Sequence, residues 1–470
     1  MFHHITIWRR NLSTGRNRVS SIIINARQTA TGFEIFFRGS RYVVNYPDEI
    51  WQAYPQVAKD ILFENLVYAE TVHLPLTFRK GEIRYNTSPP FFQTQFFQNM
   101  VMDLPSCADV DGTYTSELLK EFMNLKIKFK DNDINFPKYK EESREDSAIV
   151  SLSFGKDSLL TWAVCRELGM HPQASYIVEP VLLYEEKHKD VLAKEFQKEF
   201  GVELQKIEHT TGHLRDGPRL GVGKTEIGWG LQSTQYAMML LPIAHKFGAR
   251  YVLFGNEQSC GEHYYDREGY VCYPAYDQCH IWTTQLDSIT RQMTGGGVRT
   301  MSVIEPLNDI AVVYTLYKRY PEVAKYHMSC FVETEAGKNT RWCMDCSVCC
   351  KMYLLIKASG YDPKMVGLTR NMLTMDMRDY FSLFGGSNVQ TYALTGRGRD
   401  EQLFGFYLAW KNGDRSPLTE EFEKRFLDEA QGREDELYKT FFGINEAITM
   451  PKNINDQAVS IYKEVLSDVP

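Results

Sequence analysis

The chain has 470 residues, of which 43% are hydrophobic and 24% are charged. These fractions are typical of globular proteins, so they exclude a wholly disordered chain and allow about three domains. The net charge of −7 argues against broad, non-specific binding to nucleic acid, because no basic surplus exists to displace phosphate counterions. The sequence has neither an apolar stretch of membrane-spanning length nor a signal-peptide core at its start. We therefore expect a cytoplasmic protein without a membrane partner.

The first part of the chain, residues 1–140, is expected to form an α+β domain. Short strands rich in β-branched and aromatic residues are predicted between glycine-containing turns, over residues 18–25, 33–38 and 42–45. A helix is expected over residues 48–66. A mixed-charge stretch without apolar periodicity follows over residues 126–146, and we place a domain boundary there.

Strands and helices alternate after this boundary. Strands are predicted over residues 148–152, 176–183, 202–207 and 251–254, and helices over residues 159–168, 185–200 and 233–247. Such alternation predicts an α/β fold with a parallel sheet covered on both faces. We assign this domain to residues 147–380 and expect a helical C-terminal region over residues 381–470, with residues 420–439 as a charged helix.

The segment between the first of these strands and its helix is suited to binding phosphate. It reads Ser-Phe-Gly-Lys-Asp-Ser over residues 153–158. Free backbone N–H groups at a helix N-terminus attract an anion, and Gly155 permits close approach of the backbone. Lys156 adds a positive charge, and Ser158 can cap the helix and donate to a phosphate oxygen. The alternative is an ordinary strand-to-helix turn with a serine cap.

A second glycine-rich segment, residues 217–225, is not interpreted as a nucleoside triphosphate loop. Pro218 stands where the first glycine of the Gly-x4-Gly-Lys-Thr pattern belongs, and no convincing strand precedes the segment. Lys224 and Thr225 remain candidates for contacting a substrate.

Half of the ten cysteines lie within the 21 residues from Cys330 to Cys350. A closed structural zinc site needs four ligands, and the spacing offers them in Cys330, Cys343, Cys346 and Cys349. Adjacent residues rarely both bind one ion, so Cys350 is interpreted as a packing residue. An iron–sulfur cluster and a set of unligated cysteines are the alternatives.

The segment 153–158 resembles the PP-loop of the ATP pyrophosphatase superfamily, which usually reads Ser-Gly-Gly-Lys-Asp-Ser. Members of that superfamily typically cleave ATP between the α and β phosphates and adenylate a substrate. The resemblance implies an adenine nucleotide α-hydrolase-like fold. It also implies a site for ATP and Mg²⁺ built from Ser153, Phe154, Gly155, Lys156, Asp157 and Ser158. The chain departs from the pattern at Phe154. Since a bulky residue does not easily adopt a positive φ, we expect the loop backbone to differ from the usual form.

A PP-loop followed by a distal cysteine cluster is also the layout of 7-cyano-7-deazaguanine synthase, a shorter enzyme with structural zinc. A closer resemblance, over residues 148–410, is to the UDP-N-acetyl-α-D-muramoyl-L-alanyl-L-glutamate epimerase family. It is carried, in order, by residues 252–259, 305–312, 329–330, 341–349 and 396–401. The most specific of these is the cysteine cluster with Arg341 and Trp342 before it.

That resemblance implies an ATP-dependent isomerase that converts the terminal L-Glu of a peptidoglycan precursor to D-Glu and releases AMP and pyrophosphate. Adenylation would neutralise the carboxylate, so that the α-hydrogen can leave and a proton can return from the other face. Water would then hydrolyse the anhydride. Lys156 and Asp157 would act at this centre. Asn256 and Glu257 follow a predicted strand at the edge where open α/β sheets bind ligands, and we expect them to face it.

The sequence leaves the proton-transfer pair open among Glu257, Cys260, His263, Tyr264 and Asp266. Cys260 is a catalytic candidate because thiols serve as bases in other amino-acid racemases; a buried, inert cysteine is the alternative. Arg397 and Arg399 are candidates for clamping a carboxylate or a diphosphate, or form an ordinary solvated pair.

Two other classes of function compete with the epimerase. One is a carboxylate-activating ligase or nitrile-forming enzyme of the deazaguanine type, in which ammonia or an amine captures the adenylate. The other is a non-catalytic regulator that binds ATP without turnover. The expected partner in the first reading is a small glutamyl substrate, and the sequence leaves the oligomeric state open.

Overall fold

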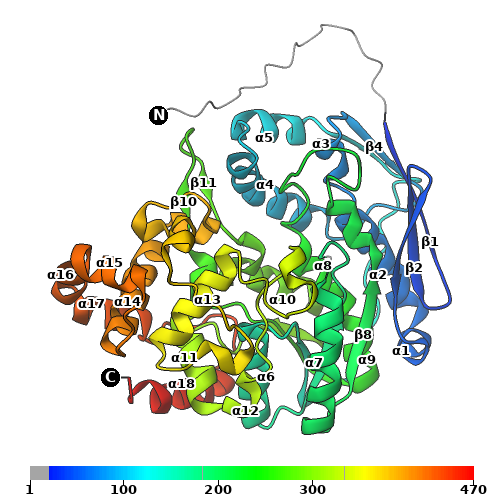
Figure 1. The fold of residues 1–470 in the computed structure, drawn as a ribbon. Helices are drawn as coiled ribbons and strands as arrows, with labels where there is room; N and C mark the ends of the chain where they lie inside the picture. Colours follow the sequence, from blue (N-terminus) through cyan, green and yellow to red (C-terminus); the bar gives the residue numbers. More distant parts are fainter. Residues whose placement is uncertain (1–20, 183, 333, 470) are drawn as a thin grey trace, which may run out of the picture.

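The computed structural model describes residues 21–182, 184–332 and 334–469. They form a mixed α/β structure around one mostly parallel, ten-stranded sheet with the order β12-β9-β6-β7-β8-β3-β2-β1-β4-β5 (Figure 1). The expected α/β class is confirmed. A two-stranded hairpin, β10-β11, lies outside this sheet. The strands are β1 (Ile22–Gln28), β2 (Gly32–Phe37), β3 (Ser40–Asn45), β4 (Glu82–Tyr85), β5 (Lys126–Lys128), β6 (Arg144–Ser151), β7 (Pro172–Ile177), β8 (Leu204–His209), β9 (Ala249–Leu253), β10 (Tyr264–Tyr265), β11 (Val271–Cys272) and β12 (Arg299–Met301).

The helices divide between the N-terminal part, the faces of the parallel strands and the C-terminal part. The first group is α1 (Asp48–Ala53), α2 (Gln56–Ala69), α3 (Leu74–Thr77), α4 (Gln93–Val110) and α5 (Thr115–Met123). The second is α6 (Lys156–Glu167), α7 (Glu185–Phe200), α8 (Gln232–Met239), α9 (Leu241–Phe247), α10 (His280–Met293), α11 (Asp309–Arg319), α12 (Pro321–Ala324) and α13 (Ser347–Ala358). The third is α14 (Gly396–Lys411), α15 (Pro417–Arg425), α16 (Leu427–Gly432), α17 (Glu434–Phe441) and α18 (Lys452–Leu466).

Two hydrophobic cores lie on opposite faces of the parallel strands. Along β6, Ala148 and Val150 belong to one core and Ile149 to the other, because successive side chains of a strand point to opposite faces. The first core includes side chains of α6, α7, α11 and α13, and the second includes side chains of α2, α8, α9 and α10. The sheet is therefore covered on both faces, as its alternating sequence pattern predicts.

The N-terminal strands extend the same sheet instead of building a second one. Strand β3 pairs antiparallel with β8, with Val44 opposite His209. Next to this pair the buried His209 ring lies 3.0 Å from a carboxylate oxygen of Glu70. Figure 1 shows the blue N-terminal strands on one side of the molecule and the orange helices α14–α17 on the opposite side. The expectation that residues 1–140 form a domain of their own stays a prediction.

Several element predictions match the structure closely. The helix predicted over residues 185–200 is α7, which ends at Gly201 with φ 64°, a left-handed conformation that favours glycine. The strand expected over residues 148–152 lies within β6, except for its last residue. The first residues of the strand expected over 18–25 lie outside the described part of the chain, and β1 begins at Ile22.

Other element predictions were wrong at their boundaries. The helix expected over residues 48–66 is interrupted at Pro55, which cannot donate the backbone hydrogen bond of a helix interior. The strand expected over residues 176–183 ends at Ile177, and the following described residues have no strand conformation. Pro242 separates the helix expected over residues 233–247 into α8 and α9.

The charged helix expected over residues 420–439 is three short helices, α15, α16 and α17. Each contacts α14, and Figure 1 shows them arranged around it. The chain bends at Phe426 and Arg433, where the helices change direction. These bends let the buried side chains of Phe422, Ala430 and Phe441 all join the first core.

Candidate functional site

A large cleft of about 910 Å³ lies at the carboxyl ends of the parallel strands. Its walls include Ser153 and residues 155–158 after β6, Glu179 beyond β7 and Asn256 beyond β9. Open α/β sheets bind their ligands at this edge. The structure thus brings the predicted loop and Asn256 to one cleft, although these segments are about a hundred residues apart in the sequence.

The loop between β6 and α6 is held by the hydroxyl of Ser158. This hydroxyl accepts a hydrogen bond from the N–H of Ser153 at 3.2 Å and donates to the carbonyl of Gly155 at 3.1 Å. The N–H of Lys156 donates to the hydroxyl of Ser329 at 3.4 Å. Residues 155–158 line the cleft, so the N-terminus of α6 lies in its wall, where the positive end of the helix dipole favours an anion.

Phe154 adopts a left-handed backbone conformation with φ 61°. The expectation that a bulky residue would avoid positive φ was wrong. Its ring is completely buried and meets the ring of Phe196 edge-on at 5.8 Å, and its carbonyl accepts a hydrogen bond from Met328 at 2.8 Å. Left-handed backbone costs roughly 1–2 kcal/mol, whereas burying an aromatic ring contributes about 1.5–3 kcal/mol. Burial of the ring therefore outweighs the backbone cost.

A buried cluster of charges lies beneath the loop. The ammonium group of Lys156 forms ion pairs with Asp157, at 2.5 Å, and with Asp309 at the start of α11. Asp309 also pairs with Lys351 of α13, whose ammonium group lies 3.7 Å from Glu401 of α14. Asp309 and Lys351 line the cleft together with the loop.

Burial and neighbouring charges give these carboxyl groups different pKa values. Burial would raise the pKa of Asp309, but Lys156 and Lys351 outweigh it and hold that pKa well below its ordinary value. Burial raises the pKa of Glu257 to about 8, and the nearby Asp309 carboxylate adds to the rise. Burial raises the pKa of Glu401 to about 7 against the opposing effect of Lys351. At neutral pH the cluster thus holds protons on Glu257 and, in part, on Glu401.

The residues after β9 divide between the cleft and the interior. Asn256 lines the cleft and donates to the hydroxyl of Thr283 at 2.9 Å. Glu257 and Cys260 are not among the cleft-lining residues. The Glu257 carboxylate accepts hydrogen bonds from the N–H of Ser259 at 2.5 Å and from the Cys260 thiol at 3.6 Å. Burial, followed by the charge of Glu257, raises the pKa of the Cys260 thiol well above its ordinary value.

The other proton-transfer candidates lie in or next to the hairpin β10-β11. The phenol of Tyr264 donates to Asp109 of α4 at 3.0 Å, and Asp266 accepts from Thr115 of α5 at 2.5 Å. The ring of His263 packs against the ring of Tyr273, with 5.7 Å between their centroids. These contacts join the hairpin to the N-terminal helices, and none of the three candidates lines the cleft.

The wall of the cleft formed by Glu179, Arg215, Trp229 and Tyr236 carries polar residues that the sequence did not single out. The guanidinium of Arg215 is fully buried, pairs with Glu179 at 2.6 Å and stacks on the ring of Trp229 at 4.9 Å. Glu179 also accepts a hydrogen bond from Tyr236 at 2.9 Å. Lys224 and Thr225 line the cleft nearby, as substrate-contacting residues would. The only sequence signal for this wall is its position beside the glycine-rich segment.

The four predicted thiols converge. The sulfur atoms of Cys330, Cys343, Cys346 and Cys349 all lie within 4.8 Å of one another, so this cluster could hold a metal ion. The Cys346 sulfur also caps α13 by accepting a hydrogen bond from the N–H of Cys349 at 3.4 Å. Cys350 is buried but is not a member of the cluster, as the sequence predicts.

A second cavity of about 540 Å³ adjoins the cleft, and Lys224, Trp229 and Gln390 line both. Its walls include Asp103 of α4 and Cys343 of the thiol cluster. The two cavities therefore lie side by side and share part of their walls.

Arg397 and Arg399 are held by carboxylates outside both cavities. Arg397 pairs with Glu262 at 2.7 Å, and Arg399 makes a bidentate pair with Glu429 at 2.9 and 3.1 Å. Neither arginine is among the residues that line the cleft or the second cavity.

Comparison of the chain with protein-family models, curated proteins and solved structures gave no match in any of the three searches. The helices of the described residues include none with both the length and the apolar character needed to cross a membrane.

The position of Phe154 yields a stability test. Phe154→Ala should lower the free energy of unfolding by about 3–5 kcal/mol, because it removes a buried ring. Phe154→Gly should be about 1 kcal/mol more stable than the alanine variant, because glycine adopts a positive φ without the steric cost. Urea unfolding of both variants measures the difference. The matched control is Phe196, a helical residue of the same ring cluster, at which alanine should be more stable than glycine. Greater stability of alanine at position 154 would contradict this account.

Proposed function

We propose that the chain is an ATP-dependent enzyme of the PP-loop type, which splits ATP into AMP and pyrophosphate while adenylating a carboxylic acid. The observation that carries the proposal is the position of loop 153–158. It places a helix N-terminus, a buried lysine and two serine hydroxyls in the wall of a large cleft at the carboxyl edge of a parallel sheet. An ordinary strand-to-helix turn has no reason to present this set of groups to an open cleft.

The residues around the loop fit ATP and Mg²⁺. The α6 N-terminus and Lys156 would hold phosphate oxygens. Asp157 and Asp309 offer carboxylate oxygens, the ligands that Mg²⁺ prefers. Bound Mg²⁺ would neutralise negative charge that develops on the departing pyrophosphate.

The acid that we propose is the terminal L-Glu of UDP-N-acetylmuramoyl-L-Ala-L-Glu or a similar glutamyl compound. Support comes from the ordered resemblance over residues 148–410 and from the second cavity, which provides room for the part of the substrate that does not react. The carboxylate would attack the α-phosphorus of ATP, and pyrophosphate would leave. The neutral acyl adenylate then permits loss of the α-proton, return of a proton from the opposite face, and hydrolysis to AMP and D-Glu.

We assign Asn256 the role of positioning the substrate and Glu257 that of supplying a proton to its α-carbon. The Cys260 thiol contacts Glu257. Asn256 lines the cleft, and its side chain is held by Thr283. Because the pKa of Glu257 is raised to about 8, this residue holds a proton at neutral pH and suits the role of a donor. The Cys260 thiol lies 3.6 Å from Glu257 and could exchange a proton with it.

We further propose that the thiol cluster holds a structural zinc ion. Tetrahedral zinc with sulfur ligands requires sulfur atoms about 3.8 Å apart. The sulfur atoms of Cys343 and Cys349 are 3.7 Å apart, which fits a single ion. A cluster of several iron and sulfide atoms would need more widely spaced thiols. Zinc bound here would fix the start of α13, because Cys346 caps that helix.

Metal analysis tests the zinc proposal. The purified protein should contain about one zinc ion per chain, and Cys343→Ser should lose the ion together with much of the stability. Cys350→Ser is the matched control, since Cys350 is a buried neighbour outside the cluster. This variant should retain the zinc. Elemental analysis that finds iron, or no metal in the wild-type protein, would contradict the proposal.

Product analysis tests the nucleotide proposal. With Mg²⁺ and the glutamyl substrate, ATP should yield AMP and pyrophosphate, and Lys156→Ala should lower the rate at least 100-fold, because a preorganised charge on the phosphates is lost. Lys194→Ala removes an exposed lysine of α7 and should leave the rate unchanged. ADP as the product would exclude a PP-loop reaction. ATP binding without turnover would favour the non-catalytic regulator.

Isotope incorporation tests the stereochemical part. In heavy water the product should carry deuterium at the α-carbon of the glutamyl residue, and only when ATP and Mg²⁺ are both present. Glu257→Gln and Cys260→Ser should slow inversion if either belongs to a two-base pair, while exchange from the remaining face continues. Glu262→Gln, which breaks only the pair with Arg397, is the control. Consumption of the acid without deuterium, dependent on an amine, would favour the amide- or nitrile-forming enzyme.

A further inference from the structure

We propose that Lys351 is a second phosphate-binding residue of the nucleotide site, acting beside Lys156 on the pyrophosphate part of ATP. This inference rests on the proposed ATP-binding function and adds a residue that the loop motif does not contain. Lys351 belongs to α13, which starts at the thiol cluster, about two hundred residues after the loop.

Lys351 lies in the wall of the cleft, together with the loop. Its side chain is 22% exposed and lines the same cleft as the loop. Its ammonium group and that of Lys156 bind the two oxygens of one carboxylate, that of Asp309. Two ammonium groups on opposite sides of one carboxylate are spaced to bind neighbouring phosphate groups, which offer the same kind of oxygen. A nucleotide whose first phosphate meets Lys156 would bring the next ones within reach of Lys351.

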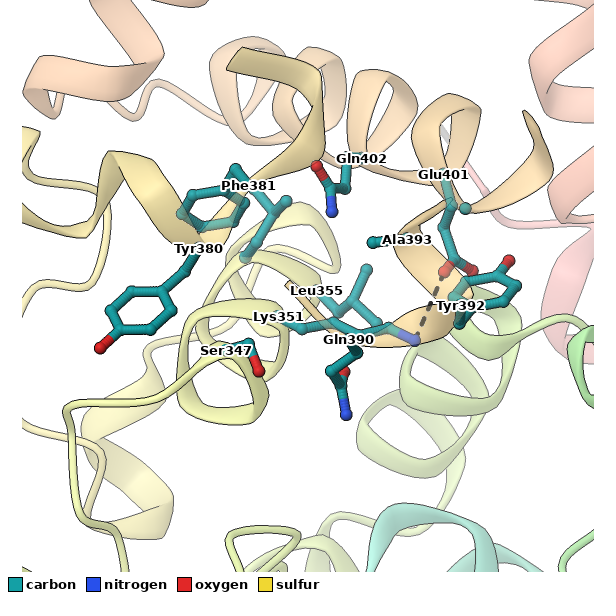
Figure 2. Close-up of a pocket in the computed structure, with 12 residues that line it drawn as sticks. Ser347, Lys351, Leu355, Tyr380, Phe381, Gln390, Tyr392, Ala393, Glu401 and Gln402 are labelled. Carbon is teal, nitrogen blue, oxygen red and sulfur yellow. Dashed lines mark ion pairs between the residues drawn. The ribbon is translucent and has the colours of Figure 1, made fainter. Parts of the chain in front are cut away.

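Surrounding groups hold Lys351 in this position. Figure 2 shows its side chain extending from α13 toward Glu401, beside Tyr392. The ammonium group lies 3.7 Å from Glu401 and 4.4 Å from the centroid of the Tyr392 ring. Glu401 is fixed in turn, because it accepts a hydrogen bond from the N–H of Ile310 at 3.1 Å. A lysine whose long side chain is already ordered loses less entropy when it binds a phosphate.

The charges around Lys351 also favour this role. Asp309 is the nearest acidic partner of both lysines, and its side chain is only 4% exposed. If phosphate oxygens replaced Asp309 as the partner of Lys351, the Asp309 carboxylate would be available to hold the Mg²⁺ that accompanies ATP. That cation would compensate the charge of Asp309, which would otherwise be costly to leave buried.

Affinity measurements with three probes separate this role from a structural one. Calorimetric titrations of the full chain should use AMP, magnesium pyrophosphate and magnesium ATP. Lys351→Met should weaken binding of pyrophosphate and ATP about tenfold or more, because a charge-assisted contact is lost, and should change AMP affinity less than twofold. Lys351→Arg should retain most of the affinity. The control is Lys357→Met on the same helix, where Lys357 pairs with Asp414 at 3.2 Å outside the cleft.

Each outcome supports or overturns the inference. Equal loss of AMP and pyrophosphate affinity, or no loss of either, would overturn it. If the wild-type chain bound none of the three probes, the proposed ATP-binding function would itself be wrong. If the wild type bound them and Lys351→Met bound them equally well, only the role of Lys351 would be wrong. Metal content and near-ultraviolet circular dichroism report whether Lys351→Met is folded. Should it misfold, Lys351→Gln provides the same test with a polar side chain.

Discussion

The carboxylate of Asp309 is the constraint on which the arrangement of the cleft depends. It neutralises Lys156 of the loop and Lys351 of α13, and its backbone N–H donates to Ser259 at 3.3 Å in the segment after β9. Removing it would take an ion-pair partner from the buried Lys156 and from the partly buried Lys351. Loss of one partner of a buried pair commonly costs about 3–5 kcal/mol. Through Lys351 the same interaction reaches Glu401 and the C-terminal helices. The loop, the thiol cluster and the C-terminal helices are therefore fixed relative to one another by charge as well as by their shared core.

Local patterns predicted those parts of this arrangement that neighbouring residues determine. The spacing of hydrophobic residues was sufficient to predict helix α7 and most of strand β6. The spacing of the cysteines was sufficient to predict that four thiols converge. Asp309, Lys351 and Arg215 were not singled out, because each becomes part of the cleft only through packing of elements far apart in the chain. Asp309 looks like an ordinary first-turn acid of a helix, and Lys351 like a surface lysine. Their burial beside Lys156 has no counterpart in local sequence.

The largest departure from expectation is the backbone of Phe154. This residue adopts a left-handed conformation because its ring is buried against Phe196, so a tertiary contact outweighs the local preference of a bulky residue for negative φ. Strand β3 pairs with β8, and hydrophobic side chains of both regions share one core. The change in composition over residues 126–146 is real, yet the sheet continues across the regions on either side of it.

Charge balance in the cluster links the proposed nucleotide site to the proposed proton chemistry. The carboxyl groups of Asp157, Asp309, Glu257 and Glu401 lie near two lysines, Lys156 and Lys351. Burial raises the pKa values of the two glutamates to about 8 and about 7, which favours their protonated forms. In the proposed reaction, a nucleotide that drew Lys156 toward its phosphates would remove part of the positive charge that lowers the pKa of Glu257. Glu257 would then hold its proton more firmly until pyrophosphate left. Return of Lys156 to the cluster would make Glu257 a stronger acid, at the step where the proposed adenylate needs a proton at its α-carbon.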